Sequence, residues 1–130
     1  MVMAIRVHRT GGPEVLQPEE LAAPNAGPGQ VLVRNTAVAV NMLDIYQRSG
    51  RPHPNQPSFP YIPGSIQVGT VESRGAGVEG LQPGMRVVGM GRFGAYSQQT
   101  VVAAERVVPV PGGLDDAEVA AIFVRGLTAY

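Results

Sequence analysis

The sequence predicts a mainly β (α+β) domain with two short helices attached to a β-barrel or sandwich. Two observations predict this class. Short apolar, β-branched runs are separated by turn signals about every ten residues, and only two segments combine helical spacing with capping residues. The 17 glycines and 12 prolines fall between the apolar runs, where turns are expected. A chain of 130 residues can form one domain with a real core, but not two ordinary domains.

The first part of the chain predicts three strands. Residues 3–7 form the first strand, which ends at a Gly-Gly-Pro turn, and residues 15–21 form a weaker second strand. Residues 31–40 form the clearest strand, because they are apolar and largely β-branched and Arg34 is the one charged residue among them. One side of this strand is therefore expected to be buried.

A short helix is predicted over residues 41–50. Asn41 is a good N-cap, and Asp44 lies in the first turn, where the helix dipole favours a carboxylate. Gly50 is suited to the left-handed conformation that ends many helices. The following residues, 51–63, are rich in proline and predict an irregular, mostly extended loop.

The later part of the chain predicts more strands and a second helix. Pro83 and Gly84 occupy the positions that a type II turn favours. The second helix begins at Asp115, with Glu118 three residues later as in a capping box, and is expected to end at Gly126. The strands are expected over residues 66–73, 86–90, 94–103 and 107–110.

Composition excludes several classes of function. The formal net charge of zero gives no electrostatic reason to expect a nucleic acid or an anionic membrane as partner. No apolar run approaches the roughly 18 residues of a membrane helix, and the start of the chain lacks the order of a signal peptide. A soluble, cytoplasmic protein is therefore expected. The chain has no cysteine and two histidines, His8 and His53, which lie in different segments, so no metal site is expected.

One glycine pattern invites a nucleotide-binding interpretation that its context does not support. Residues 75–80 match G-x-G-x-x-G and follow a predicted strand. A dinucleotide site also needs a helix directly after the glycines, because the N–H groups at its start hold the pyrophosphate. Pro83 and Gly84 arrive too soon for such a helix, so the pattern is interpreted as a turn between strands.

A different segment carries a family resemblance. Residues 40–50 resemble the V-N-x-x-D-x-Y-x-R-x-G segment of the zinc-free (zeta-crystallin-like) quinone oxidoreductases in the medium-chain dehydrogenase/reductase superfamily. Further family patterns follow in the same order and cover the chain. They are P-x-x-P-G at residues 60–64, G-x-V and G-x-G-V at 69–71 and 75–78, P-G-x-R-V at 83–87, G-A-Y at 94–96 and G-L-T-A-Y at 126–130.

This resemblance implies a fold and a domain organisation. The family's N-terminal domain is a GroES-like, partly open β-barrel, which agrees with the elements expected above. Residues 1–125 would form this substrate-side (catalytic) domain, and residues 126–130 would begin the linker into a nucleotide-binding Rossmann domain that is absent from this chain. The missing Rossmann domain would be the main partner. Zinc-bearing relatives carry cysteine where this chain has Asn41, which implies a zinc-free protein.

The resemblance also implies an activity. The full family member would reduce a quinone or a conjugated enone with NADPH, and this chain alone would be inactive and would bind no cofactor tightly. The alternative is a free-standing or engineered GroES-like module with a non-catalytic scaffold or binding role. Without a Rossmann domain, apolar surface near Ile122, Phe123 and Leu127 would be uncovered, so a homodimer is expected.

Three residues are implied as catalytic: Asn41, Asp44 and Tyr46. Asn41 and Tyr46 would also bind the cofactor, together with Thr128, which could bond the nicotinamide amide. Each has a structural alternative. Asn41 is equally an N-cap, Asp44 a first-turn carboxylate that orients the helix, Tyr46 a half-buried aromatic, and Thr128 an ordinary packing residue.

Four positions depart from the family patterns. Ile66 and Met85 stand where acids are usual, which would exchange polar interactions for apolar packing. Arg125 replaces a common glutamine, and Pro52 replaces an aromatic residue near the expected site.

Overall fold

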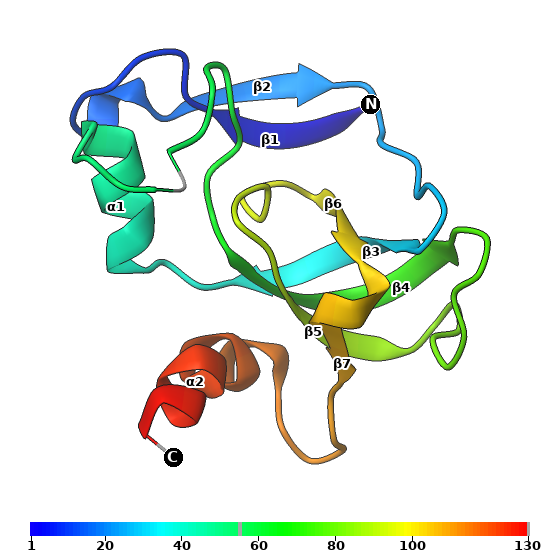
Figure 1. The fold of residues 1–130 in the computed structure, drawn as a ribbon. Helices are drawn as coiled ribbons and strands as arrows, with labels where there is room; N and C mark the ends of the chain where they lie inside the picture. Colours follow the sequence, from blue (N-terminus) through cyan, green and yellow to red (C-terminus); the bar gives the residue numbers. More distant parts are fainter. Residues whose placement is uncertain (55, 130) are drawn as a thin grey trace.

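The computed structural model describes residues 1–54 and 56–129, apart from the side chains of residues 124, 125 and 127–129. The described chain is mainly β, as predicted, with two α-helices (Figure 1). All strand pairs are antiparallel and form a two-stranded sheet, β1-β2, and a five-stranded sheet of order β6-β3-β4-β5-β7. The strands are β1 (Val2–Arg6), β2 (Gln17–Leu21), β3 (Gln30–Val38), β4 (Ile66–Arg74), β5 (Arg86–Met90), β6 (Gln99–Ala103) and β7 (Val107–Pro109). The helices are α1 (Met42–Ser49) and α2 (Asp116–Ala129), with short 3₁₀ turns η1 (Pro13–Val15) and η2 (Ala104–Arg106).

The centre of the large sheet is the β3-β4 pair, which follows from the strong strand signal of both segments. Its register shifts twice, between Leu32 and Val33 and between Asn35 and Ala37. Such irregularities bend a strand and increase its twist, so the sheet curls toward a partly open barrel. Arg34 points away from the core and pairs with Glu72 on β4.

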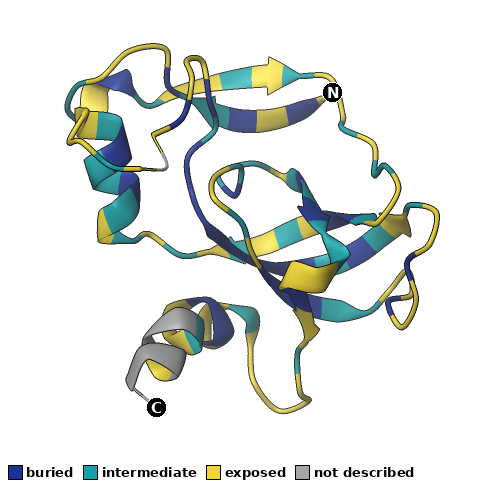
Figure 2. Ribbon diagram, viewed as in Figure 1, coloured by how far each residue is buried: buried dark blue, intermediate teal, exposed yellow. Residues whose placement is uncertain are grey.

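Among the described residues, two clusters of buried apolar side chains form most of the core, and the buried stretches of the strands are dark blue in Figure 2. The first fills the barrel with buried side chains of Val31, Val33, Val71, Val78, Leu81, Val87, Val102 and Val107. The second lies where α2 covers the sheet and contains Ile66, Val68, Val88, Val119 and Ala120. The β-branched residues that predicted the strands are therefore also the residues that the strands bury.

The start of α2 is fixed to the sheet by polar contacts. The Asp116 carboxylate accepts hydrogen bonds from Arg86 on β5 and from the Thr36 hydroxyl on β3. These two hydrogen bonds hold the pKa of Asp116 below its usual range. One residue earlier, Asp115 caps the helix by accepting the Glu118 N–H at 2.8 Å, as predicted.

Most predicted elements are confirmed, with three differences. The strand expected over residues 94–103 begins at Gln99, because the preceding residues turn and bond elsewhere, with Gly94 N–H donating to Ile62 and Tyr96 N–H to Pro63. Residues 13–15 form η1 before the strand begins. The second helix continues past Gly126 to Ala129, since glycine costs a helix about 1 kcal/mol without ending it.

The helices also bear on membrane insertion. Within residues 1–54 and 56–129, neither helix has the length and apolar character needed to cross a bilayer.

Candidate functional site

Helix α1 holds the expected site residues at the point where β3 ends. Asn41 has extended backbone (φ −121°) and precedes the helix, and its N–H donates to the Asp44 carboxylate at 3.0 Å. At the other end, Gly50 adopts the left-handed conformation (φ 80°) predicted for it. The capping residues recognised in the sequence therefore fix both ends of the helix.

Asp44 is buried beneath this helix and contacts a distant part of the chain. Its side chain is 4% exposed, and Oδ2 accepts both the Asn41 N–H and the Tyr96 O–H, the latter at 2.8 Å. Burial raises the pKa of Asp44, although the two hydrogen bonds oppose the change. Burial and the bond to Asp44 also raise the pKa of Tyr96 above its usual range. Asp44 thus joins α1 to the segment before β6.

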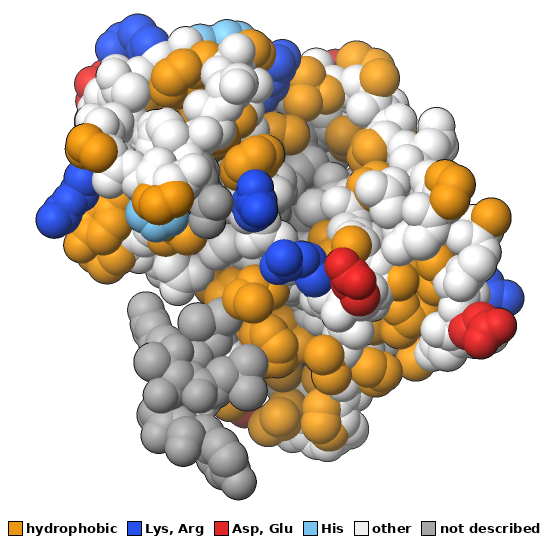
Figure 3. Space-filling model, in the orientation of Figure 1, with side chains coloured by type: hydrophobic (Ala, Val, Ile, Leu, Met, Phe, Trp, Pro, Cys, Tyr) orange, Lys and Arg blue, Asp and Glu red, His pale blue; other side chains and the backbone are white. Residues whose placement is uncertain are grey.

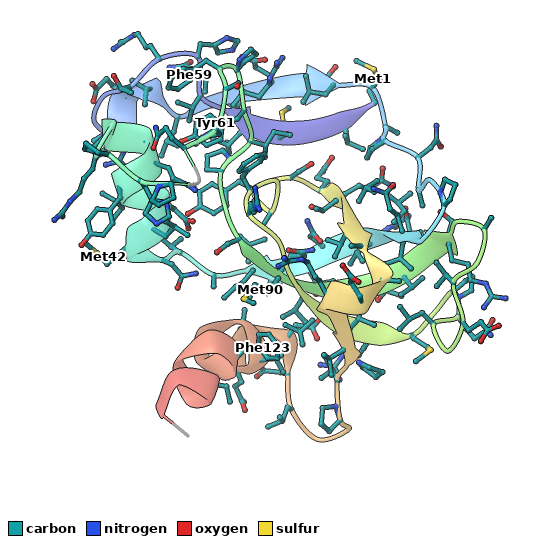
Figure 4. All side chains as sticks on the ribbon, in the orientation of Figure 1. Met1, Met42, Phe59, Tyr61, Met90 and Phe123 are labelled. Carbon is teal, nitrogen blue, oxygen red and sulfur yellow. The ribbon has the colours of Figure 1, made fainter. Side chains whose placement is uncertain are left out.

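A hollow of about 420 Å³ opens beside α1, over the ends of β4 and β5. Leu43 and Gln47, one turn apart on the helix, line one wall. The other lining residues are Asn41, Ser65, Ile66, Met90, Gly91, Arg92 and Arg106. In Figure 4, Met90 is seen just above Phe123 of α2. The hollow therefore combines apolar walls with amide, hydroxyl and guanidinium groups.

The structure brings together only some of the expected site residues. Asn41 lines the hollow, and Asp44, which does not, is joined to Asn41 by the hydrogen bond from the Asn41 N–H. Tyr46 does not line this hollow; it is half-buried, and the Arg51 guanidinium lies 4.5 Å from its ring centre. The side chain of Thr128 lies outside the described residues.

Two of the four departures from the family patterns, Ile66 and Met85, lie in apolar surroundings, whereas Pro52 is exposed. Ile66 is 2% exposed and belongs to the cluster beneath α2. Met85 is partly buried against the barrel cluster. Both side chains therefore pack against apolar neighbours, although Met85 Sδ also accepts the Gln82 N–H at 3.1 Å. The Arg125 side chain lies outside the described residues.

The glycine pattern at residues 75–80 is a turn between β4 and β5, as predicted. The Gly75 N–H already donates to the Gln30 carbonyl at 2.8 Å, and the Ala76 carbonyl accepts from Gly29 at 2.9 Å. A Cβ on Gly75 would lie 1.7 Å from the Gly27 carbonyl oxygen. This glycine therefore serves the contact between two loops, and its amide is not available to a phosphate.

Metal-ligating groups do not gather in the described part of the chain. There, no group of three or more His, Cys, Asp or Glu side chains lies close enough to hold an ion. His8 instead pairs with Glu19 across the small sheet.

Sequence reasoning missed three side chains that define this region. Tyr96 belongs to the G-A-Y pattern, but nothing local to it indicates a bond to Asp44 across 52 positions. Arg92 and Arg106 line the hollow from two separate segments. One signal was available in the sequence: charged residues make up only 15% of this chain, and each of these two arginines follows a short strand or a turn.

Comparison with known proteins places these features in context. The family model of the alcohol dehydrogenase GroES-like domain matches residues 27–112. The chain is 42% identical to 2-haloacrylate reductase of a Burkholderia species over 99% of its length, and 36% identical to quinone oxidoreductase 1 of Escherichia coli over its full length. It covers only 40% and 39% of these two relatives, so it spans about two fifths of their length.

A solved structure agrees with the sequence comparison. The crystal structure of Escherichia coli quinone oxidoreductase complexed with NADPH matches with a TM-score of 0.91 and 35% identity. The match covers 98% of this chain and 39% of that one. The crystal structure of 2-haloacrylate reductase matches with a TM-score of 0.86 and 39% identity. Its match covers 98% of this chain and 38% of that one.

Proposed function

This chain belongs to the alcohol dehydrogenase GroES-like family, as a domain of the quinone oxidoreductase branch of the medium-chain dehydrogenase/reductase superfamily, and we propose that it is the substrate-side half of an NADPH-dependent reductase. The substrate is a quinone or another acceptor with a conjugated carbon–carbon double bond. The relatives that support this class are named for quinones and for 2-haloacrylate. The reaction needs a nucleotide-binding domain, and the reductase is expected to act in the cytoplasm as a homodimer.

The observation that carries this proposal is the hollow beside α1. Its volume of about 420 Å³ suits a ring-sized molecule, and its apolar walls from Leu43, Ile66 and Met90 suit an unsaturated one. Asn41 places one amide donor and one amide acceptor at this hollow. Such a site can orient a planar polar ring through hydrogen bonds from the amide while its apolar walls contact the ring faces.

The described residues fit one end of NADPH and not the other. Asn41 and the neighbouring neutral groups offer hydrogen bonds to a nicotinamide ribose or carboxamide. The glycine pattern at residues 75–80 does not offer a phosphate cradle, because the Gly75 N–H is already bonded within the chain. NADPH supplies the hydride when it is bound. The phosphates are therefore assigned to a separate nucleotide-binding domain.

The chain's own residues position the reactants. The Asn41 amide orients the substrate carbonyl or the nicotinamide ribose. Asp44 acts as a positioning residue, since its buried carboxylate fixes the Asn41 N–H and the Tyr96 O–H rather than facing the hollow. Tyr46 would donate its O–H to the reduced oxygen, which requires its side chain, now outside the lining of the hollow, to turn toward it. Thr128 would bond the nicotinamide amide.

The test compares the chain alone with a joined protein. The purified chain should not oxidise NADPH with 1,4-benzoquinone above the uncatalysed rate, and nicotinamide fluorescence should not show tight binding. The same chain, exchanged for the corresponding segment of Escherichia coli quinone oxidoreductase 1, should restore both. An Asn41→Ala version of the chimera should lose turnover while it still binds NADPH. A chimera that binds NADPH but reduces neither benzoquinone nor a simple enone would contradict the proposal and favour the scaffold role.

A further inference from the structure

Two positively charged side chains belong to the lining of the hollow beside α1. Arg92 follows the end of β5, and Arg106 closes η2, so two separate segments bring guanidinium groups to the same lining. Among the described residues, no aspartate or glutamate belongs to that lining. Glu105 is an exposed neighbour of Arg106 in the sequence and does not line the hollow. In Figure 3, basic side chains stand near the middle of the displayed face with an acidic patch at their side.

These two arginines differ from six other arginines in the described chain, although Arg9, in the exposed turn after β1, also has no ion pair or side-chain hydrogen bond among the described residues. Arg6, Arg34 and Arg86 form ion pairs with carboxylates. Arg48 and Arg74 donate to backbone carbonyls, and Arg51 lies over a tyrosine ring. Across residues 1–54 and 56–129, Arg92 and Arg106 have neither an acidic partner nor a side-chain hydrogen bond. Their donors therefore remain available to a ligand.

The rest of the lining limits what that ligand can be. Leu43 and Met90 present apolar side chains to the hollow, and the buried Ile66 side chain lies beneath it, so the floor of the hollow is apolar. A ligand that satisfies both parts has a short apolar body and one anionic end. The planar guanidinium matches a carboxylate in particular, because it can donate two parallel hydrogen bonds to its two oxygens.

We propose that the hollow beside α1 selects acceptors that carry a carboxylate, and that Arg92 and Arg106 bind this carboxylate while the conjugated double bond lies against the apolar floor. The inference rests on the proposed function for the reduction itself, but the binding step needs only this chain. The substrate class is therefore α,β-unsaturated acids rather than uncharged quinones alone.

The experiment is an NMR titration of the ¹⁵N-labelled chain with trans-4-oxo-2-pentenoate and, in parallel, with its uncharged carboxamide. The acid should shift the Nε–Hε signals of Arg92 and Arg106 and the backbone signals of Ser65 and Gly91. These shifts should saturate as the concentration of the acid rises. The carboxamide should bind at least about fivefold more weakly than the acid, because a fivefold loss of affinity corresponds to one exposed charge pair. Equal shifts from acid and carboxamide, or no shift at these residues, would overturn the proposal.

Matched variants and a second anion complete the design. Arg92→Gln and Arg106→Gln should each weaken binding of the acid about fivefold or more, whereas Arg9→Gln, a control in the exposed turn after β1, should not. Inorganic phosphate is the competing source of negative charge. If phosphate binds these two arginines more tightly than the acid does, the site serves a phosphate and the carboxylate assignment is wrong. None of these readings uses NADPH, so a failure here is separate from a failure of the reductase proposal.

Discussion

At the scale of single residues, the Asp44–Tyr96 hydrogen bond is the contact that most directly fixes the proposed site. Tyr96→Phe removes one of two donors to the Asp44 carboxylate and leaves a buried acceptor poorly satisfied. Such a loss costs about 1–3 kcal/mol of unfolding free energy. Urea unfolding should show this destabilisation.

The control for this change is Tyr46→Phe, because Tyr46 is half-buried and its hydroxyl has no hydrogen bond within the described residues. That variant should lie within about 0.5 kcal/mol of the parent. Equal stability of the two phenylalanine variants would show that the Tyr96 hydroxyl contributes nothing to the fold.

The raised pKa of Asp44 predicts a pH dependence of known sign. Above the ordinary aspartate pKa and below the raised one, the folded chain binds more protons at this carboxyl than the unfolded chain does. The stability that this group contributes is therefore complete below its unfolded pKa and is lost as the pH rises through its folded pKa.

Asp44→Asn isolates this effect, because asparagine does not titrate. The stability of the parent relative to the variant should fall between acidic and neutral pH, measured by urea unfolding at several pH values. A relative stability that rises with pH would contradict the burial argument, since it would require a lowered pKa.

At the scale of elements, the end of α1 depends on one backbone conformation. Gly50 has φ 80°, and a Cβ there would come within 2.9 Å of the Thr10 methyl group. Gly50→Ala should therefore cost about 1–2 kcal/mol in urea or thermal unfolding, the usual penalty for a left-handed alanine. Gly112→Ala is the matched control, because that glycine has ordinary φ and open space around its Cβ position. It should change stability by less than about 0.5 kcal/mol.

The elements also show how far sequence reasoning reaches. Local chemistry predicted α1 with both caps, β5 with its bounds, and the turn at Gly84, because each signal lies within a few neighbouring residues. It failed for residues 94–98, whose backbone bonds go to Ile62, Pro63 and the first strand rather than to a regular ladder partner. The candidate site divides in the same way. Local chemistry predicted the capping roles of Asn41 and Asp44, and the family resemblance of residues 40–50 proposed them for the site, whereas Tyr96 and the two arginines reach it only through the fold.

At the scale of the whole molecule, the outer surface beside α2 predicts self-association. An apolar hollow of about 340 Å³ lies between α2 and the β5-β7 edge, and Val108 and Ile122 at its rim are 50% and 54% exposed. Phe123 packs against the buried cluster beneath α2, so its substitution would damage the fold as well as the surface. Ile122 is therefore the better probe of an interface.

The chain should sediment as a concentration-dependent dimer, because a surface of this kind is usually covered by a partner. Ile122→Lys should shift it to the monomer, since an unpaired charge is costly to bury. Met3→Lys adds the same charge to β1 in the other sheet, at a side chain that is 42% exposed, and should leave the dimer intact. A chain that stays monomeric at all concentrations, or an equal response to both lysines, would contradict this prediction.

The contact between Gly75 and Gly27 has a consequence for how this chain can evolve. Every single-nucleotide change in a glycine codon that alters the amino acid and does not end the chain introduces a Cβ, and at position 75 that atom would fall 1.7 Å from a backbone oxygen. Selection for folding alone is then enough to preserve the first glycine of the G-x-G-x-x-G pattern in descendants of this gene. An invariant Gly75 in an alignment would record the crossing of two loops, and a search that scores the pattern by its conservation would assign a nucleotide to a turn that cannot bind one.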